Sequence, residues 1–281
     1  MAHAAARVSN RENILREGVF MHRTRLLNGS LSLICWIIIS LCHTTHALAT
    51  SYSTDQSDLW YNKGEAGWGI QFVQRGSVIF ATMFVYDAAN KPTWFTALLA
   101  PTNQSWTGDL YETNGPWFGS AVFSSAAVSR RTVGTMTWQN TGEHSEAGTL
   151  TYSVDGTQVR KNIVRQTLVL DDYSGSYTGM LSWRDCGGSR ENVIDLTVTQ
   201  AGDTITVMWF NTGTGMRCSY PGTLTQEGQF GSFTGSFSCT SHAGSFTIYE
   251  LQVTQAAISG RLHDEVNGCI TEAYFGGTRH R

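Results

Sequence analysis

A group of aromatic side chains around one carboxylate is the set of residues in this sequence best suited to binding chemistry. Its members are Trp60, Tyr61, Glu65, Trp68 and Trp94. Indole and phenol rings stack on sugars and pack on apolar ligands, and the glycine-flanked Glu65 can accept hydrogen bonds from a ligand. The same rings also fill the cores of small barrels, so core packing is the competing interpretation. We take these five residues as the predicted ligand-binding residues.

Paired carboxylates are the alternative chemistry, because glycoside hydrolysis uses one carboxyl group as acid and a second as base or nucleophile. The candidates are Glu65, Asp109 and Glu112. Their spacing does not single out a pair, and the motifs of serine hydrolases and phosphate loops do not occur. The sequence therefore predicts no catalytic residue, and hydrolysis stays a second alternative to binding.

A metal site is the third possibility, and it has little support. His263-Asp264-Glu265 offers three ligands, but adjacent residues on a strand point to opposite faces. The cysteines outside the N-terminal segment lack the two-to-four-residue spacing typical of zinc sites. We therefore expect no cofactor and no metal.

The cysteines predict disulfides instead. Four of them follow residue 49, namely Cys186, Cys218, Cys239 and Cys269. An even number in an exported chain is typical of a disulfide framework. Cys218 and Cys239 flank one hairpin, and Cys186 and Cys269 lie where the first and last strands of a closed barrel would pair. We expect Cys218–Cys239 and Cys186–Cys269, with the other two connectivities left open.

Hairpins must position these residues, and a repeated phrase marks them. It is a strand followed by Gln, a spacer and Gly, at Gln74-Arg75-Gly76, Gln200-Ala201-Gly202 and Gln226-Glu227-Gly228, with a weaker copy at Gln255. The glycine supplies the positive φ that a hairpin turn requires. Apolar residues repeat at strand period, and helix-period patterns are absent after residue 49. Successive hairpins make a meander, which closes most simply into a barrel.

Glycines that precede apolar residues predict bends in the strands of such a barrel. They are Gly108, Gly148, Gly179, Gly222, Gly235 and Gly260. Six of the eight tryptophans after residue 49 precede residue 170, and the four cysteines follow it. We predict an all-β protein with two tandem antiparallel meander barrels of about eight strands each, or barrel-like sandwiches. The Trp-rich domain spans 58–167, the disulfide-stapled domain spans 168–281, and 50–57 is a linker.

Residues 1–49 have the pattern of a signal peptide. Arg23 and Arg25 precede an apolar run at 31–42, and Ala47-Leu48-Ala49 is a cleavage-site pattern. Met21 stands where such a peptide begins, so the start at Met1 or Met21 stays open, as does an uncleaved anchor. The remaining chain has 14 basic and 20 acidic residues, a net charge of −6, which argues against nucleic acid as a partner.

Residues 58–165 resemble a domain of exported proteins of Gram-negative bacteria. Its motif opens Trp-Trp-Asn-Pro-x-Glu-Ser-Gly-Trp-Gly and continues Phe-Ala-Thr-Trp-Phe-x-Tyr-Asp and Pro-x-Trp, matching residues 60–69, 80–87 and 92–94. This chain departs from the motif at Tyr61, Lys63-Gly64, Ala66 and Met83. The resemblance implies export and a β-rich domain, but no reaction. The second half loosely resembles calycin-type barrels, the lipocalin and avidin group, which bears on the fold only.

The predicted protein is an exported, periplasmic or extracellular, non-catalytic binding protein for a glycan or a small amphipathic ligand. An envelope protein-interaction or inhibitor module is the alternative. A large cavity lined by tryptophan would favour ligand binding, whereas a closed core with a flat aromatic patch would favour a protein partner. Two carboxylates that face each other in a cleft would favour hydrolysis. No transmembrane segment is expected after residue 49, because the strands lack continuous outward apolar faces.

Overall fold

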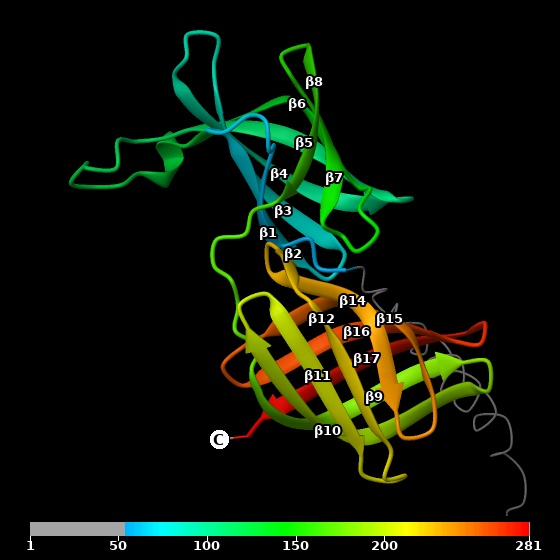
Figure 1. The fold of residues 1–281 in the computed structure, drawn as a ribbon. Helices are drawn as coiled ribbons and strands as arrows, with labels where there is room; N and C mark the ends of the chain where they lie inside the picture. The colour runs from blue at the N-terminus through cyan, green and yellow to red at the C-terminus, as the bar shows by residue number, and fades with distance from the viewer. Residues whose placement is uncertain (1–53, 281) are drawn as a thin grey trace, which may run out of the picture. The chain divides into compact units, whose positions relative to one another are not determined.

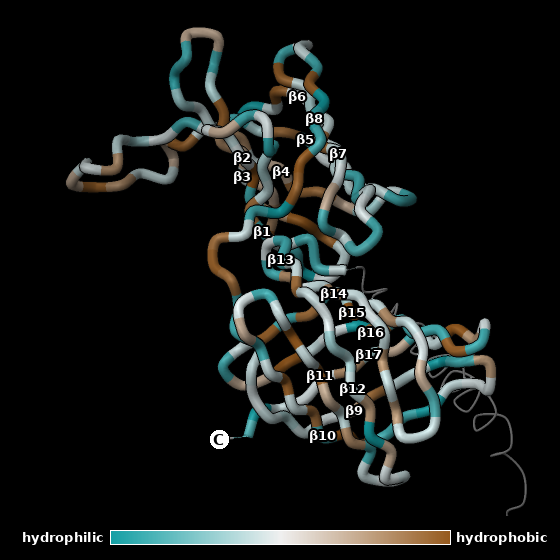
Figure 2. Tube along the Cα trace, viewed as in Figure 1, coloured by the Kyte–Doolittle hydropathy of each residue, from teal (hydrophilic) through white to brown (hydrophobic). Residues whose placement is uncertain are grey.

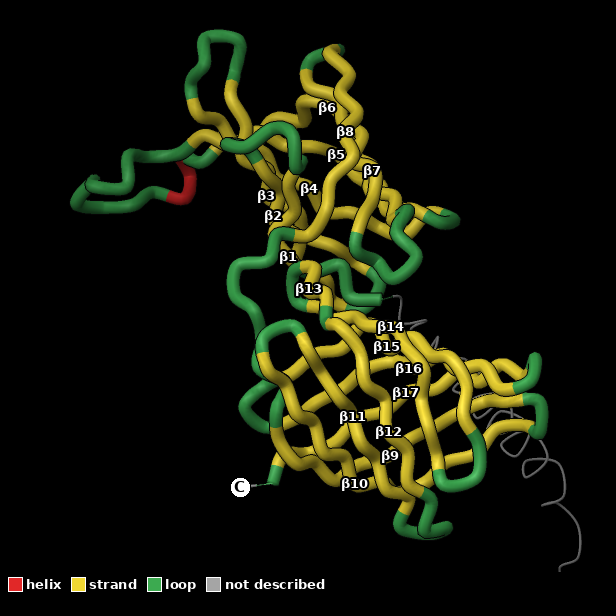
Figure 3. The backbone as a smooth tube through the Cα atoms, viewed as in Figure 1, coloured by secondary structure: helices red, strands yellow, loops and turns green. Residues whose placement is uncertain are grey.

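The structure, a computed structural model, describes residues 54–280. The predicted signal peptide, both candidate start codons and half of the predicted linker (50–53) lie outside the described residues. The described chain is built almost entirely of strands, with one 3-10 turn at Ser125–Ala127 (Figure 3). Within 54–280 no helix has the length and hydropathy needed to cross a membrane.

The first eight strands form a closed antiparallel barrel, in which each strand pairs with the next one in the chain (Figure 1). They are β1 (Asp58–Tyr61), β2 (Gly69–Arg75), β3 (Val78–Tyr86), β4 (Pro92–Thr102), β5 (Ser105–Asn114), β6 (Ser129–Asn140), β7 (Ala147–Val154) and β8 (Thr157–Arg165). Pairing of β1 with β8 closes the ring. Hydropathy alternates along these strands (Figure 2), because every second side chain enters the core.

The second barrel follows the same plan. Its strands are β9 (Gly175–Asp185), β10 (Gly188–Ala201), β11 (Thr204–Asn211), β12 (Arg217–Thr223), β13 (Thr225–Glu227), β14 (Phe230–Cys239), β15 (Ala243–Val253), β16 (Ala257–Val266) and β17 (Cys269–Arg279). The first and last strands, β9 and β17, pair antiparallel, and a β12–β14 pairing completes the ring, with short β13 added on β14. The prediction of two eight-strand antiparallel barrels is confirmed.

Both disulfides lie at seams of the second barrel. Cys218 and Cys239 are directly opposite each other where β12 meets β14. Cys186 follows β9 and is joined to Cys269, the first residue of β17. These are the two pairs that the meander order predicts.

The glutamine of the repeated Gln-x-Gly sequence links a hairpin turn to the segment that precedes the first strand of a barrel, through hydrogen bonds made by its side-chain amide. Gly76, Gly202 and Gly228 have φ of 58°, 64° and 62°, and the Nε2 of the glutamine two residues earlier donates to each glycine carbonyl. The same glutamines accept, at Oε1, the backbone N–H of Gln56, Tyr173 and Asp171, respectively. Gln74 thereby holds the segment before β1, and Gln200 and Gln226 hold the segment before β9.

In each barrel, an arginine on the last strand covers an aromatic ring on the first strand. The Arg165 guanidinium lies 4.5 Å from the Trp60 ring centre, and that of Arg279 lies 4.9 Å from the Tyr177 ring centre. The two pairs are cross-strand neighbours in equivalent positions. In both barrels the aromatic side chain also donates to the carbonyl oxygen four residues earlier.

The glycines predicted to mark bends allow close strand approach. A Cβ placed on any of Gly108, Gly148, Gly179, Gly222, Gly235 or Gly260 would overlap a neighbouring group. At Gly179 that group is the carbonyl oxygen of Gly276, on the paired strand β17. Only a residue without Cβ leaves room for such tight coiling.

Candidate functional site

Trp60 lies in the core of the first barrel. Its side chain is 0% exposed, and its ring centre is 4.6 Å from that of Trp138 and 5.9 Å from that of Phe72. The indole N–H of Trp60 donates to the Gln56 carbonyl, and that of Trp138 donates to Gln56 Oε1. Of the two interpretations, ligand binding and core packing, the structure supports core packing for Trp60, whose ring is not exposed to solvent.

Glu65 and Trp68 are in contact, and each carboxylate oxygen of Glu65 accepts a hydrogen bond from another side chain of the protein. Trp68 Nε1 donates to Glu65 Oε2 at 3.0 Å, and Lys161 Nζ donates to Glu65 Oε1 at 2.8 Å. The Lys161 hydrogen bond, followed by that from Trp68, holds the pKa of Glu65 below its usual value. Tyr61 is half-buried nearby in the chain, opposite Val164 on β8. Both carboxylate oxygens of Glu65 already have partners within the chain.

Trp94 points outward and belongs to a different surface. It lies opposite Phe84 on β3, and both side chains are about half exposed, at 49% and 48%. On the same outer side, Phe80 lies opposite Val73 on β2 and Leu98 on β4, all three of them exposed. We call these five residues the outer apolar face. The structure therefore separates Trp94 from Trp60, which is inside the barrel.

The other carboxylates considered for hydrolysis also have separate partners. Glu112 forms an ion pair with Arg131 at 2.8 Å, and Asp109 accepts from the Tyr111 hydroxyl at 3.2 Å. With Glu65 bound to Lys161, the three candidates take three different partners. This arrangement gives no support to a pair acting across one bond.

The most apolar of the larger hollows lies in the mouth of the second barrel, at the end opposite Arg279. It has a volume of about 410 Å³, within the range of small-molecule pockets. Its lining includes Leu181, Trp183, Trp209, Met216, Tyr220 and Leu262. Cys269, one partner of a seam disulfide, lies at its rim. Two other hollows, of about 470 and 520 Å³, have linings of mixed polarity.

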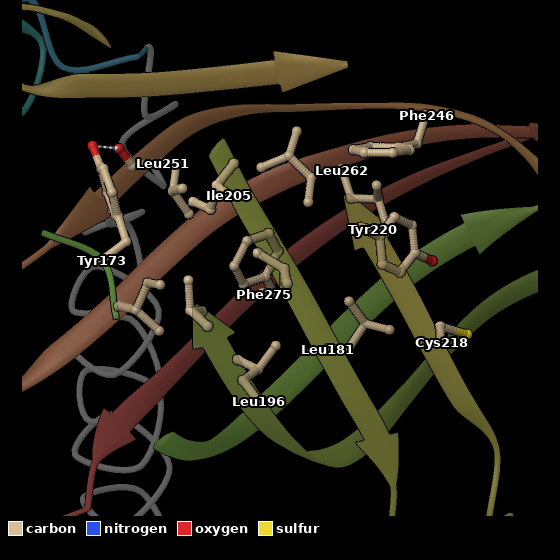
Figure 4. Close-up of a cluster of buried hydrophobic side chains, with 14 of the residues drawn as sticks. Tyr173, Leu181, Leu196, Ile205, Cys218, Tyr220, Phe246, Leu251, Leu262 and Phe275 are labelled. Atoms are coloured by element: carbon tan, nitrogen blue, oxygen red, sulfur yellow. Dashed lines mark hydrogen bonds between the residues drawn. The ribbon is translucent and has the colours of Figure 1, made fainter. Parts of the chain in front are cut away.

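The floor of this cavity is formed by Trp209 and Tyr220, whose rings meet edge to face with centres 5.7 Å apart. Beneath them, toward Leu196 and Ile248, the core leaves a hollow of only about 10 Å³. Figure 4 shows the apolar core of this barrel, with Tyr220 and Cys218 toward one end and Tyr173, hydrogen-bonded to the Leu251 carbonyl, at the other.

Buried polar groups converge on the floor. The Trp209 Nε1 and the Tyr220 hydroxyl are buried, and neither forms a hydrogen bond of normal geometry. Asp264 is 7% exposed, and burial raises the pKa of its carboxyl group, while Thr271 and His242 act in the opposite direction. Burial, with the nearby Asp264 charge, also raises the pKa of Tyr220. Few polar groups in an apolar hollow are the usual arrangement of a ligand site.

The weak metal candidate at His263-Asp264-Glu265 divides between two faces. His263 Nδ1 lies 2.6 Å from Glu272 Oε1 on the outer side, whereas Asp264 points into the barrel. Within residues 54–280 no group of three or more metal-binding side chains comes together.

Sequence reasoning missed the cavity, although part of the signal is present. Leu262 and Asp264 are two residues apart, so strand alternation places the Asp264 carboxylate inside with Leu262. Ile205, Val207 and Trp209 alternate in the same way on β11. The pattern of one strand does not show that the barrel mouth is open above these residues, because side chains from several strands determine whether the mouth is filled.

Comparison with known proteins adds little. Neither a family model nor a curated protein matches the chain. Among solved structures, the isotype 1 transferrin binding protein B from serogroup B Neisseria meningitidis is 9% identical, with a TM-score of 0.31 over 80% of this chain and 69% of that chain. A tryptophan-to-alanine mutant of transferrin binding protein B from Haemophilus parasuis Hp5 is also 9% identical, with a TM-score of 0.30 over 78% and 62%. A likeness at this level carries no argument about function.

Proposed function

We propose that this protein is a non-catalytic binding protein that takes a small amphipathic molecule into the mouth of its second barrel. The observation that carries the proposal is the cavity of about 410 Å³ above Trp209 and Tyr220. Its aliphatic and aromatic lining favours an apolar ligand body over a glycan, which would need many more polar partners. The two tryptophans in its lining, Trp183 and Trp209, are the feature expected of ligand binding.

Export is part of the proposal. Two disulfides in one small domain are typical of an oxidising compartment outside the cytosol. The signal-peptide pattern at residues 1–49 also supports export, as does the resemblance of residues 58–165 to exported proteins of Gram-negative bacteria.

A fluorescent amphipathic probe, aminoanthracene, tests the proposal. It should bind the chain saturably with a rise in fluorescence. Val266→Trp, which puts a large ring into the mouth, should abolish binding because Val266 lines the cavity. Glu265→Trp is the matched control: the same ring on the adjacent, outward-facing residue should leave binding unchanged. Equal binding to both variants would show that the probe sits elsewhere.

A protein partner is the second candidate function, and the outer apolar face favours it. The first barrel has a closed core, with Phe80, Phe84 and Trp94 exposed on one side. Contiguous exposed apolar residues mark interaction sites on soluble proteins. If this face binds an envelope protein, Phe84→Ser with Trp94→Ser should lose a partner that the original chain captures, while Val266→Trp retains it. Capture that the double variant does not change would remove this candidate.

A further inference from the structure

The buried polar atoms on the cavity floor specify the chemistry of the ligand's inner end. The Trp209 Nε1–H is a donor only, and the Tyr220 hydroxyl can donate. Both are buried, and the interactions of the hydroxyl with Trp209 and Asp264 lie outside normal hydrogen-bond geometry. A buried donor without an acceptor is unfavourable, and a ligand oxygen placed between the two would remove that penalty. The floor therefore favours a ligand whose inner end presents a hydrogen-bond acceptor.

The polar and charged groups around the floor disfavour two kinds of inner end. A ligand carboxylate would bring a second acid next to the buried Asp264, and two like charges are disfavoured where water is excluded. A ligand ammonium has no acceptor to offer the two donors. Asp264 would attract its charge, but Arg190 and His242 also line the cavity, and Asp185 is already 3.5 Å from Arg190.

We propose, on the basis of the function proposed above, that the ligand is an uncharged amphipathic molecule with a carbonyl oxygen at its inner end. That oxygen accepts hydrogen bonds from Trp209 Nε1 and the Tyr220 hydroxyl. The apolar body extends toward the rim along Leu181, Met216 and Leu262. Esters, ketones and amides of fatty chains are the ligand class that this arrangement recognises.

Probes of equal chain length and different end groups test the inference. Methyl nonanoate, nonanoate and nonylamine are each used to displace aminoanthracene from the full chain. Methyl nonanoate should be the strongest competitor. Trp209→Phe and Tyr220→Phe should each weaken it about three- to tenfold, the equivalent of one hydrogen bond. The affinity for aminoanthracene itself, which has no oxygen acceptor, should change little.

Trp183→Phe is the matched control, because it makes the same change in the same cavity. The Trp183 Nε1 already donates to Asp185 Oδ2 at 3.3 Å, so its loss should not weaken methyl nonanoate relative to aminoanthracene. If Trp183→Phe weakens the ester as much as Trp209→Phe does, the effect is one of packing and the inference is overturned.

The remaining outcomes separate the inference from the proposed function. If aminoanthracene and all three competitors fail to bind, the proposed function and the inference are both refuted. If they bind but nonanoate or nonylamine competes better than the ester, the cavity is a site and only the inference is wrong. A further readout needs no ligand: Tyr220→Phe removes a buried hydroxyl that forms no hydrogen bond of normal geometry, so the thermal midpoint should rise. A fall would show that the hydroxyl is already satisfied within the chain, for example by Asp264, and would overturn the inference.

Discussion

Replacing Arg165 with methionine should be among the most damaging single changes to the first barrel. The Arg165 side chain is 0% exposed, and its ion pair with Asp58 measures 3.0 Å. It also donates to the carbonyl oxygens of Ser145, Ser57 and Asp55, at 2.7, 3.1 and 2.6 Å. Burial lowers the pKa of Arg165, and the bond to Asp58 opposes that shift.

The magnitude follows from what the substitution leaves behind. Methionine keeps the packing volume over Trp60 but leaves the Asp58 carboxylate, only 13% exposed, and three carbonyl groups without this donor. Removing one partner of a buried ion pair costs about 3–5 kcal/mol of unfolding free energy. For a domain of this size, that loss corresponds to a fall of at least about 10 °C in the melting temperature.

Arg131→Met is the matched control. Arg131 pairs with two carboxylates, Glu112 and Asp155, but its side chain is 53% exposed. Exposed ion pairs contribute about 0–1 kcal/mol, so this variant should melt within a few degrees of the original. Urea denaturation and thermal melting, followed by tryptophan fluorescence, measure both. If Arg131→Met lowers the unfolding free energy as much as Arg165→Met does, then the number of ion pairs, and not their burial, determines the loss of stability, which would refute this prediction.

Three further predictions concern the second barrel. Gly179→Ala should lower the unfolding free energy by about 3 kcal/mol, because the new Cβ would overlap the backbone of β17. Gly276→Ala is the control: its Cβ would have no neighbour closer than 3.6 Å, so it should cost under about 1 kcal/mol in the same thermal melt. Replacing Cys218 and Cys239 together by serine should cost about 3 kcal/mol, since the bond closes a loop with a sequence separation of 21; equal melting with and without reductant would contradict this. Burial raises the pKa of Asp264 in the folded state, so its stabilising contribution should be present below pH 3.8 and be lost as the pH rises through the raised pKa. Asp264→Asn should therefore gain stability relative to the original chain as the pH rises. Parallel pH profiles of the urea midpoint for the two proteins would refute this assignment.

The fold was largely predictable, because local patterns decide it. Period-two alternation, glycine turns and the glutamine phrase identify hairpins, and hairpins in chain order leave a closed meander as the simplest arrangement. The pairing Cys218–Cys239 follows from the same order. The linking role of Gln74 was not predictable, because its partner Gln56 is brought to it by tertiary structure. The equivalence of Arg165 and Arg279 was hidden for the same reason.

The candidate site was much less predictable. Aromatic type does not reveal which rings face solvent: Trp60 packs inside, Trp94 lies outside, and Trp68 is held by Glu65. Strand alternation does place Trp209 and Asp264 inside the second barrel. Whether an interior position is packed or open depends on side-chain volumes summed over several strands, and a single strand's pattern does not contain that sum.

The most direct measurement of the central claim is a two-dimensional NMR titration of the tryptophan indole N–H signals with methyl nonanoate. The indole N–H of Trp209, on the cavity floor, should shift most, and that of Trp183 should respond because its ring lines the same cavity. The signals of Trp60 and Trp138, fully buried in the first barrel, should stay in place. Saturable shifts confined to Trp68 or Trp94 would instead locate binding at the first barrel and contradict the account.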